Sequence, residues 1–231
     1  MNNPYVSCIM PTANRPQFVE LAIFHFLNQN YQDAELIIID DGKAPIRNLI
    51  PNHKKIRYFY NTSYSSLGNK RNFACRQANG KIIIHWDDDD YYAKDWISSQ
   101  VYFLEKSKAD ICGLNDIYFF SPLFQKYWRW TDKNNERPFL MGATLVYHKQ
   151  FWENHPFKDI NIGEDHDFIW NQGANIYAHN YTDGFCAILH SGNTTIKPFE
   201  DPKYKKYAVE DMDVEFEGDN PPNSITNEMF K

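Results

Sequence analysis

The amino-acid sequence predicts an α/β protein whose central sheet is mostly parallel. Uninterrupted apolar runs, each typical of a buried strand, recur through residues 6–86. Helical patterns separate several of these runs, and strands that alternate with helices form parallel sheets covered on both faces. Ligands of such sheets bind at the carboxyl ends of the strands. The polar residues that follow each run are therefore the first candidates for a functional site.

The N-terminal part of the chain supplies most of these elements. Strands are expected at Val6–Met10, Leu36–Ile39, Ile56–Tyr60 and Lys81–Trp86. The first helix buries residues at i, i+3, i+4, i+7 and i+8, which are Val19, Ala22, Ile23, Phe26 and Leu27. Two more helices are expected at Leu67–Ala78 and Asp95–Glu105. We expect Pro11 to break the first strand and Asn14 or a neighbour to cap the first helix, with Pro16 in its first turn.

After residue 110 the segments become shorter and more aromatic. The stretch Ile117–Trp130 predicts a hairpin, and Glu164–Gln172 predicts a helix. Further short strands are expected at Ala143–Tyr147, Ile176–Tyr181 and Phe185–Leu189. From about Lys197 the chain is rich in proline and acidic residues, which predicts an extended or partly disordered arm.

Composition excludes some classes of protein and favours others. A net charge of −6 argues against nucleic acid as a main partner. No window approaches the ~18 apolar residues of a membrane span, and the N-terminus enters a strand without a basic and apolar signal region. We therefore expect a cytoplasmic protein, and aromatic surface residues leave peripheral membrane contact open. The four cysteines form no CxxC pair, so neither a zinc site nor a disulfide framework is expected.

Four consecutive carboxylates, Asp87 to Asp90, follow the isoleucine run of the fourth strand. Like charges at the end of a buried strand repel one another and lose solvation. A bound hard cation would offset this cost, because carboxylate oxygens are its preferred ligands. The alternative is an acidic turn that is simply solvated. The polar residues at the ends of the other strands favour the bound cation over the solvated turn.

Five short motifs, taken in order, resemble those of family-2 glycosyltransferases with the GT-A fold. They are Val6–Thr12, Ile38–Gly42, Gly68–Asn72, Trp86–Asp90 and Gly163–Asp165, within residues 5–195. The resemblance implies a nucleotide-binding, mostly parallel central sheet flanked by helices, with a small mixed acceptor-side subdomain. It implies a nucleotide-sugar-binding half at residues 1–110 and an acceptor-binding half with the catalytic base at residues 111–196. The acidic arm at residues 197–231 lies outside it.

The resemblance assigns the acidic loop to a divalent metal and the donor diphosphate. The Asp-x-Asp motif of the family matches Asp87 and Asp89, which implies Mn²⁺ or Mg²⁺. Asp89 is expected to be the most direct ligand, with Asp87 on the ribose or sugar and Asp88 beside the nucleotide. Asp88 or Asp90 could instead only shape the turn. Some relatives place a metal-binding histidine where His190 stands. The alternative for His190 is a structural role.

The same resemblance places further residues around the nucleotide. Pro11, Thr12 and Arg15 would line its pocket, and Asp41 would accept a hydrogen bond from the N–H of a uracil base. Arg71 would face a phosphate or fix the acidic loop. The alternatives are a turn residue for Asp41 and an exposed helical charge for Arg71. Lys70 is expected to face solvent.

Glu164 and Asp165 match the acidic pair that supplies the general base in the family. An inverting transfer needs one base, which takes the proton of the attacking acceptor hydroxyl, and no carboxylate nucleophile. Asp165 is the expected base and Glu164 its supporting residue, with Asp167 as the competing candidate. An acidic helix N-terminus is the structural alternative.

The expected reaction is therefore an inverting, metal-dependent transfer of a sugar from a nucleotide-sugar to an acceptor hydroxyl. A UDP-sugar is the expected donor, and a glycan, a lipid-linked molecule or a protein is the acceptor. Two rivals stay open. A nucleotidyltransferase would share the metal and carboxylates but release pyrophosphate, and an inactive module would bind a nucleotide or sugar without chemistry.

Overall fold

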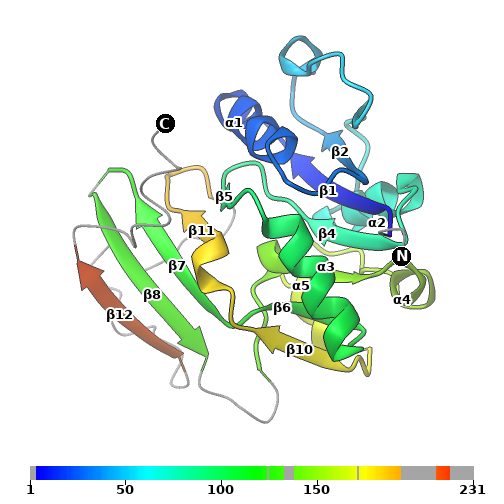
Figure 1. Ribbon diagram of the computed structural model, residues 1–231. Coiled ribbons are helices and arrows are strands. Elements are labelled where there is room, and N and C mark those ends of the chain that lie inside the picture. The colour runs from blue at the N-terminus through cyan, green and yellow to red at the C-terminus, as the bar shows by residue number, and fades with distance from the viewer. Residues whose placement is uncertain (1–3, 124, 133–137, 171, 194–211, 219–231) are drawn as a thin grey trace.

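A computed structural model describes residues 4–123, 125–132, 138–170, 172–193 and 212–218 (Figure 1). The helices are α1 (Pro16–Leu27), α2 (Leu67–Gln77), α3 (Trp96–Ser107), α4 (Lys149–Asn154) and α5 (Glu164–Trp170), with 3₁₀ turns η1 (Arg47–Leu49), η2 (Gly142–Thr144) and η3 (Thr182–Gly184). The strands are β1 (Val6–Thr12), β2 (Ala34–Asp40), β3 (Ile56–Tyr60), β4 (Ile82–His85), β5 (Tyr91–Tyr92), β6 (Ile111–Leu114), β7 (Asp116–Ser121), β8 (Lys126–Asp132), β9 (Val146–His148), β10 (Ile176–His179), β11 (Phe185–Ile188) and β12 (Met212–Gly218). No helix within these ranges is long and apolar enough to span a bilayer.

The main sheet has seven strands in the order β10-β6-β9-β4-β1-β2-β3. Strands β4, β1, β2 and β3 run parallel to one another, with Val6 opposite both Ala34 and Ile82. Only β9 runs against its neighbours β4 and β6, within the strands that the structure describes. The predicted mostly parallel sheet is confirmed, and strands from the predicted acceptor half complete it. The functional division at residues 110 and 196 stays a prediction.

Helices cover both faces of this sheet because successive strand side chains point in opposite directions. Cys8 and Met10 pack in one core with residues of α1 and α3. Ile9, between them in sequence, packs in the other core with residues of α2, α4 and α5. Strands buried on both sides need apolar residues at every position, which explains the continuous isoleucine runs.

The first strand ends later than expected and the first helix begins without the expected cap. Strand β1 continues through Pro11 to Thr12, because both residues still pair with β2. Helix α1 begins at Pro16 as predicted, but Arg15 precedes it and makes no side-chain cap. Asn14 has a positive φ of 56°, and its side chain accepts a hydrogen bond from the Lys43 backbone instead. The turn after β1 is therefore tied to the turn after β2.

A second sheet of five strands has the order β12-β8-β7-β11-β5 and lies beside the main sheet (Figure 1). The predicted aromatic hairpin is confirmed as antiparallel β7 and β8. Part of the predicted C-terminal arm, β12, pairs antiparallel with β8. The rest of the predicted arm, residues 197–211 and 219–231, lies outside the described residues. Strand β11 brings residues 185–188 back beside β5, which follows the acidic loop.

Candidate active site

A cavity of about 510 Å³ lies at the carboxyl ends of the main strands. Its lining includes most of the predicted site residues, which are Pro11, Thr12, Arg15, Arg71, Asp87, Asp89, Glu164 and Asp165. The remaining three, Asp41, Asp88 and His190, join the site by contacts to lining residues. The polar residues that follow β1, β2 and β4 therefore gather at one edge of the sheet.

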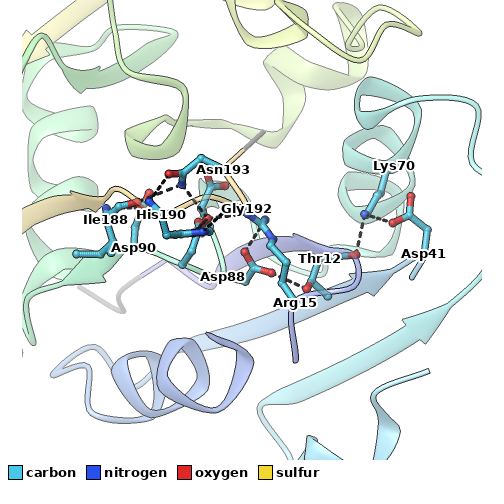
Figure 2. Close-up of polar contacts among 12 residues, drawn as sticks. Thr12, Arg15, Asp41, Lys70, Asp88, Asp90, Ile188, His190, Gly192 and Asn193 are labelled. Atoms are coloured by element: carbon cyan, nitrogen blue, oxygen red, sulfur yellow. Dashed lines mark hydrogen bonds and ion pairs between the residues drawn. The ribbon is translucent and has the colours of Figure 1, made fainter. Parts of the chain in front are cut away.

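The acidic loop after β4 is held by the turn after β1 (Figure 2). Thr12 donates a hydrogen bond of 2.5 Å from Oγ1 to Oδ2 of Asp88. The guanidinium of Arg15 bridges two carboxylates, with Nη2 2.6 Å from Oδ1 of Asp88 and Nη1 2.6 Å from Oδ2 of Asp89. Arg15 thus lies in the predicted pocket and partly neutralises the loop.

Three carboxylates of this loop have the spacing of a metal site. Oxygens of Asp87, Asp89 and Asp90 all lie within 4.8 Å of one another. Nε2 of His190 lies 2.9 Å from Oδ2 of Asp89, and Oδ1 of Asp90 accepts a hydrogen bond from the Ile188 backbone. An oxygen-rich set of this kind suits Mg²⁺ or Mn²⁺. Asp90, for which shaping the turn was one alternative, belongs to the cluster.

The electrostatics of the loop favour a bound cation. Burial raises the pKa values of Asp87 and Asp90 above their ordinary range. Burial raises the pKa of Asp88 to about 7, and the Arg15 guanidinium opposes part of this rise. A raised carboxyl pKa means that the ionised form is disfavoured where it stands. A divalent cation would restore that form, so the residues present fit the metal that the sequence predicts.

Arg71 connects the acidic loop to the start of α5. It is 4% exposed, and its Nε donates a hydrogen bond of 3.1 Å to Oε1 of Glu164. Its Nη2 lies 3.8 Å from Oδ1 of Asp87. Burial alone lowers the pKa of Arg71, but the carboxylates of Asp87 and Glu164 outweigh it and raise the pKa above its ordinary value. Arg71 is therefore a buried cation of the site and not an exposed helical charge.

His85 lies beneath the acidic loop and supports Arg71. Its Nδ1 lies 3.0 Å from Nη1 of Arg71 and 2.7 Å from the carbonyl oxygen of Gly142 in η2. Burial lowers the pKa of His85 well below its ordinary value, so the ring is neutral. A neutral ring can sit beside a guanidinium without repulsion. It joins β4, α2 and η2 in one polar network.

Asp165 and Glu164 are the acidic residues of α5 that line the cavity. Oδ1 of Asp165 accepts a hydrogen bond of 2.8 Å from the backbone N–H of His166. Glu164 beside it is buried and bound to Arg71. The competing candidate, Asp167, is 4% exposed and forms an ion pair with Lys158. Of these three acids, only Asp165 both lines the cavity and has a carboxylate that forms no ion pair among the described residues.

The carboxylate of Asp165 rests directly on Gly142, a residue that the sequence analysis did not single out. A methyl group built on Gly142 would lie 1.9 Å from Oδ2 of Asp165. Only glycine at this position of η2 leaves room for the carboxylate. The sequence holds no local signal for this requirement, because residues 142 and 165 meet only in the folded chain.

Lys70 was expected to face solvent, and this expectation is wrong. It is 5% exposed and lines the cavity. Its ammonium donates a hydrogen bond of 2.8 Å to the carbonyl oxygen of Thr12 and forms an ion pair with Asp41 (Figure 2). The N-terminal part of α2 packs against β1, so a long side chain at this position reaches the strand ends. The carboxylate of Asp41, which the sequence already placed in the site, is the signal that could have indicated a buried lysine at this position.

Comparison with known proteins identifies the family. The family described as "Glycosyl transferase family 2" matches residues 7–162, a span that contains three of the five sequence motifs completely and all but the first residue of a fourth. The chain belongs to glycosyl transferase family 2. The expected resemblance is therefore confirmed.

Curated relatives match a little under half of this chain's length. A glycosyltransferase of Haemophilus influenzae, described as uncharacterized, is 35% identical over 109 residues, which are 45% of this chain and 44% of that protein. The "GalNAc(5)-diNAcBac-PP-undecaprenol beta-1,3-glucosyltransferase" of Campylobacter jejuni is 33% identical over 117 residues, which are 48% of this chain and 38% of that protein. The matched part thus spans less than half the length of these relatives.

Solved structures with the same fold are glycosyltransferases of the GT-A type. S. aureus TarS 1–349 in complex with UDP has a TM-score of 0.59 at 17% identity, over 80% of this chain and 60% of that one. The mannosyltransferase PcManGT from Pyrobaculum calidifontis, in complex with GDP-Man and Mn²⁺, has a TM-score of 0.63 at 16% identity, over 82% of this chain and 57% of that one. At these identities the likeness shows the fold, and the predicted GT-A fold is confirmed.

Proposed function

We infer that this family-2 glycosyltransferase moves a sugar from a nucleoside diphosphate sugar to an acceptor hydroxyl, with inversion at the anomeric carbon. One observation carries the proposal. A single cavity brings together a carboxylate cluster with metal spacing, two arginines and, outside the cluster, the carboxylate of Asp165, which forms no ion pair among the described residues. These are the parts that a metal-assisted transfer with a single general base requires.

Asp87, Asp89 and Asp90 would hold Mn²⁺ or Mg²⁺, with His190 reaching the site through Asp89. Such an ion stabilises the negative charge that develops on a departing diphosphate. Among these residues we assign Asp89 as the most direct ligand, because it occupies the second aspartate position of the family's Asp-x-Asp motif and belongs to the cluster. The fold neighbour PcManGT was solved with Mn²⁺, which supports the choice of ion.

The chain's own residues would bind the rest of the donor. Pro11 and Thr12 line the wall between the acidic loop and Asp41, where a nucleoside would lie. The guanidinium groups of Arg15 and Arg71 border the same cavity and suit phosphate oxygens. We favour a UDP-sugar, since the carboxylate of Asp41 can accept the imide N–H of uracil. TarS was solved with UDP, which supports this choice.

Asp165 would act as the general base and take the proton of the acceptor hydroxyl as the oxygen attacks the anomeric carbon. Glu164 supports it, because Arg71 holds the Glu164 carboxylate in place at the start of α5. An inverting transfer needs no carboxylate that forms a covalent intermediate with the sugar. Much of the acceleration would come from holding donor and acceptor in the right geometry.

The acceptor side of the cavity includes apolar residues, among them Phe119, Met141 and Ile162. Ile162 is 75% exposed, which suits contact with a partly apolar acceptor. The Campylobacter relative is named for an undecaprenol-linked acceptor, and we propose a lipid-linked acceptor here, with a free glycan or a protein as alternatives. Such an acceptor would bring a cytoplasmic enzyme to the membrane surface.

Binding of UDP with Mn²⁺ should stabilise the folded protein. A ligand present at 100 times its Kd adds about 2.7 kcal/mol to the free energy of unfolding. For a chain of this size each kcal/mol raises Tm by roughly 2–4 °C, so we expect a rise of several degrees. Thermal melts with UDP and Mn²⁺, with each alone, and with EDTA added check this. A melt that none of these additions changes would contradict the proposal.

The products distinguish transfer from the nucleotidyltransferase rival. With a UDP-sugar and Mn²⁺, phosphorus NMR should show UDP accumulating and EDTA should stop it. Pyrophosphate in place of UDP would favour nucleotidyl transfer. Binding without turnover of any sugar nucleotide and acceptor would favour the inactive module.

Gly142→Ala should lower kcat while leaving the fold and donor binding nearly unchanged. The new methyl group displaces the carboxylate of Asp165, and a displacement of about 1 Å can cost roughly 100-fold in rate. Only the end of one side chain has to move, so Tm should change little. In a protein that already carries Asp165→Asn, the same substitution should cost almost nothing more, since the two changes act on one group. If the two substitutions lowered kcat by independent factors that multiply in the double variant, the contact between Gly142 and Asp165 would be contradicted.

A further inference from the structure

The part of the chain that carries β3 is strongly basic, although the whole chain has a net charge of −6. Residues 42–86 hold nine lysines and arginines and no aspartate or glutamate. Two of the nine, Lys70 and Arg71, belong to the site described above, and Arg57 is paired with Glu35. Four others lie in or beside β3 and form no ion pair among the described residues; they are Arg47, Lys54, Lys55 and Arg76.

Strand β3 gathers these cations at one end of the main sheet, since it is the last strand in the described order. Lys54 and Lys55 directly precede its first residue. On the face of the strand that belongs to the α1 side, Cζ of Arg47 lies 5.7 Å from the centre of the Tyr58 ring. The cations therefore lie along a single strand and are not scattered over the surface.

Aromatic rings lie beside the cations on the face of β3 that α2 covers. Phe59 of β3 packs against Phe73 of α2 with the ring centres 5.6 Å apart, and Tyr64 packs against the same ring at 5.4 Å. Cζ of Arg76 lies 5.9 Å from the centre of the Phe73 ring. Arginine and aromatic side chains combine an apolar body with a polar tip, which suits the boundary between water and lipid.

This surface continues to the mouth of the cavity. The loop 61–66 leaves β3, and the hydroxyl of Ser65 donates a hydrogen bond of 2.6 Å to Oδ1 of Asp159. The segment that begins at Asp159 exposes two isoleucines, with Ile160 39% and Ile162 75% exposed. Ile162 also lines the cavity. Exposed apolar side chains at the cavity mouth are therefore tied to the basic strand through this loop.

Two kinds of polyanion could meet unpaired cations of this sort, a nucleic acid and an anionic bilayer. The isoleucines distinguish them. The boundary of the acyl chains would bury Ile160 and Ile162, which is favourable for apolar side chains. A sugar-phosphate backbone offers them no such environment. The combination of cations and exposed isoleucines therefore favours the bilayer.

We propose that this β3 surface docks the protein on a bilayer rich in anionic lipid. Its residues are Arg47, Lys54, Lys55, Arg76, Ile160 and Ile162. The cations would meet phosphate headgroups, and the isoleucines would reach the boundary of the acyl chains. The mouth of the cavity would then lie at the lipid surface, where a lipid-linked acceptor enters. That last step rests on the function proposed above, whereas docking is measured without turnover.

Sedimentation with lipid vesicles tests docking directly. The wild-type protein should bind vesicles that contain phosphatidylglycerol at least about 10-fold more tightly than vesicles of phosphatidylcholine alone, since each cation near an anionic surface contributes about 5-fold. Raising NaCl from about 0.1 M to about 1 M shortens the Debye length from about 10 Å to about 3 Å. The higher salt concentration should therefore release the protein from the anionic vesicles.

Arg47→Gln combined with Lys54→Gln should weaken binding to the anionic vesicles by about 25-fold, the effect of two cations. Lys106→Gln combined with Lys108→Gln is the matched control. It makes the same change in net charge at two exposed lysines, at the end of a helix, α3, that packs on β6 and β10 at the other end of the main sheet. This control should leave vesicle binding nearly unchanged.

Ile160→Ser removes an apolar contact without a change of charge, so it should weaken binding while the dependence on salt stays the same. Equal binding to both kinds of vesicle, or to neither, would overturn the proposal. Equal losses in the two double variants would also overturn it, because they indicate an effect of total charge. Binding to a DNA duplex and to no vesicle would make nucleic acid the partner instead. A protein that docks as expected but binds no UDP with Mn²⁺ would support docking and contradict the proposed function.

Discussion

Asp165→Asn should reduce sugar transfer by about 10²- to 10⁴-fold, the usual contribution of a general base, and leave donor affinity nearly unchanged. The asparagine amide fits the same space beside Gly142 but cannot accept a proton from the acceptor hydroxyl. Steady-state kcat and the affinity for UDP with Mn²⁺, measured on the same preparation, separate the two effects. Loss of the charge also removes repulsion with Asp87, so metal binding should not weaken.

Asp167→Asn is the matched control, since it makes the same chemical change on the same helix. Asp167 is buried and held by Lys158, so its substitution should lower stability more than it lowers kcat. If Asp165→Asn transferred sugar at the normal rate while Asp167→Asn did not, the assignment of the base would be reversed. If both kept the normal rate, the base would lie outside α5.

Asp89→Asn should remove Mn²⁺ binding and, with it, transfer. Substitution of residues that only orient a metal ligand costs about 10- to 100-fold in affinity, so loss of a direct ligand should cost more. The fold should survive, because Arg15 keeps its contact with Asp88. Manganese titration followed by electron paramagnetic resonance measures the affinity with and without UDP.

Asp183→Asn is the control for this change, because Asp183 is exposed and lies in η3, outside the cavity lining. It should leave Mn²⁺ affinity and transfer unchanged. An Asp89→Asn protein that binds Mn²⁺ as tightly as the wild type would show that Asp87 and Asp90 form the site without Asp89. Activity that EDTA does not reduce in the wild type would contradict metal dependence altogether.

The sequence predicted well the parts of the fold that depend on local patterns. Continuous runs such as Ile82–Ile84 are needed wherever a strand is covered on both faces, so they marked β4 and the edge at which the acidic loop lies. Parallel strands share that edge, which is why Thr12 and Asp88 could be expected near each other before their contact was seen. The order of β9 and the pairing of β12 depend on long-range contacts and left no local pattern.

The site residues that sequence reasoning missed are those defined by contacts across the fold. Gly142 matters only because Asp165 lies on it. Lys70 looked like a solvated charge on a polar helix, and its burial follows from how the start of α2 meets β1 and β2. Asp90 looked like a turn residue, and its place in the carboxylate cluster depends on the return of Ile188 from the second sheet.

The reversed direction of β9 has a mechanical consequence. Because β9 runs against β4, the chain enters β9 at the edge where it leaves β4, and Val146 pairs with Ile84. The η2 turn, which supports Asp165, leads into β9, and the loop that bears Asp87 follows β4. The turn and the loop are therefore both anchored to the same pair of hydrogen-bonded strands. Any rigid-body opening between the two halves of the chain would break backbone hydrogen bonds between these two strands. Substrates should then enter and leave through movements of surface loops over a stiff platform, and closure of one lobe upon another is not needed.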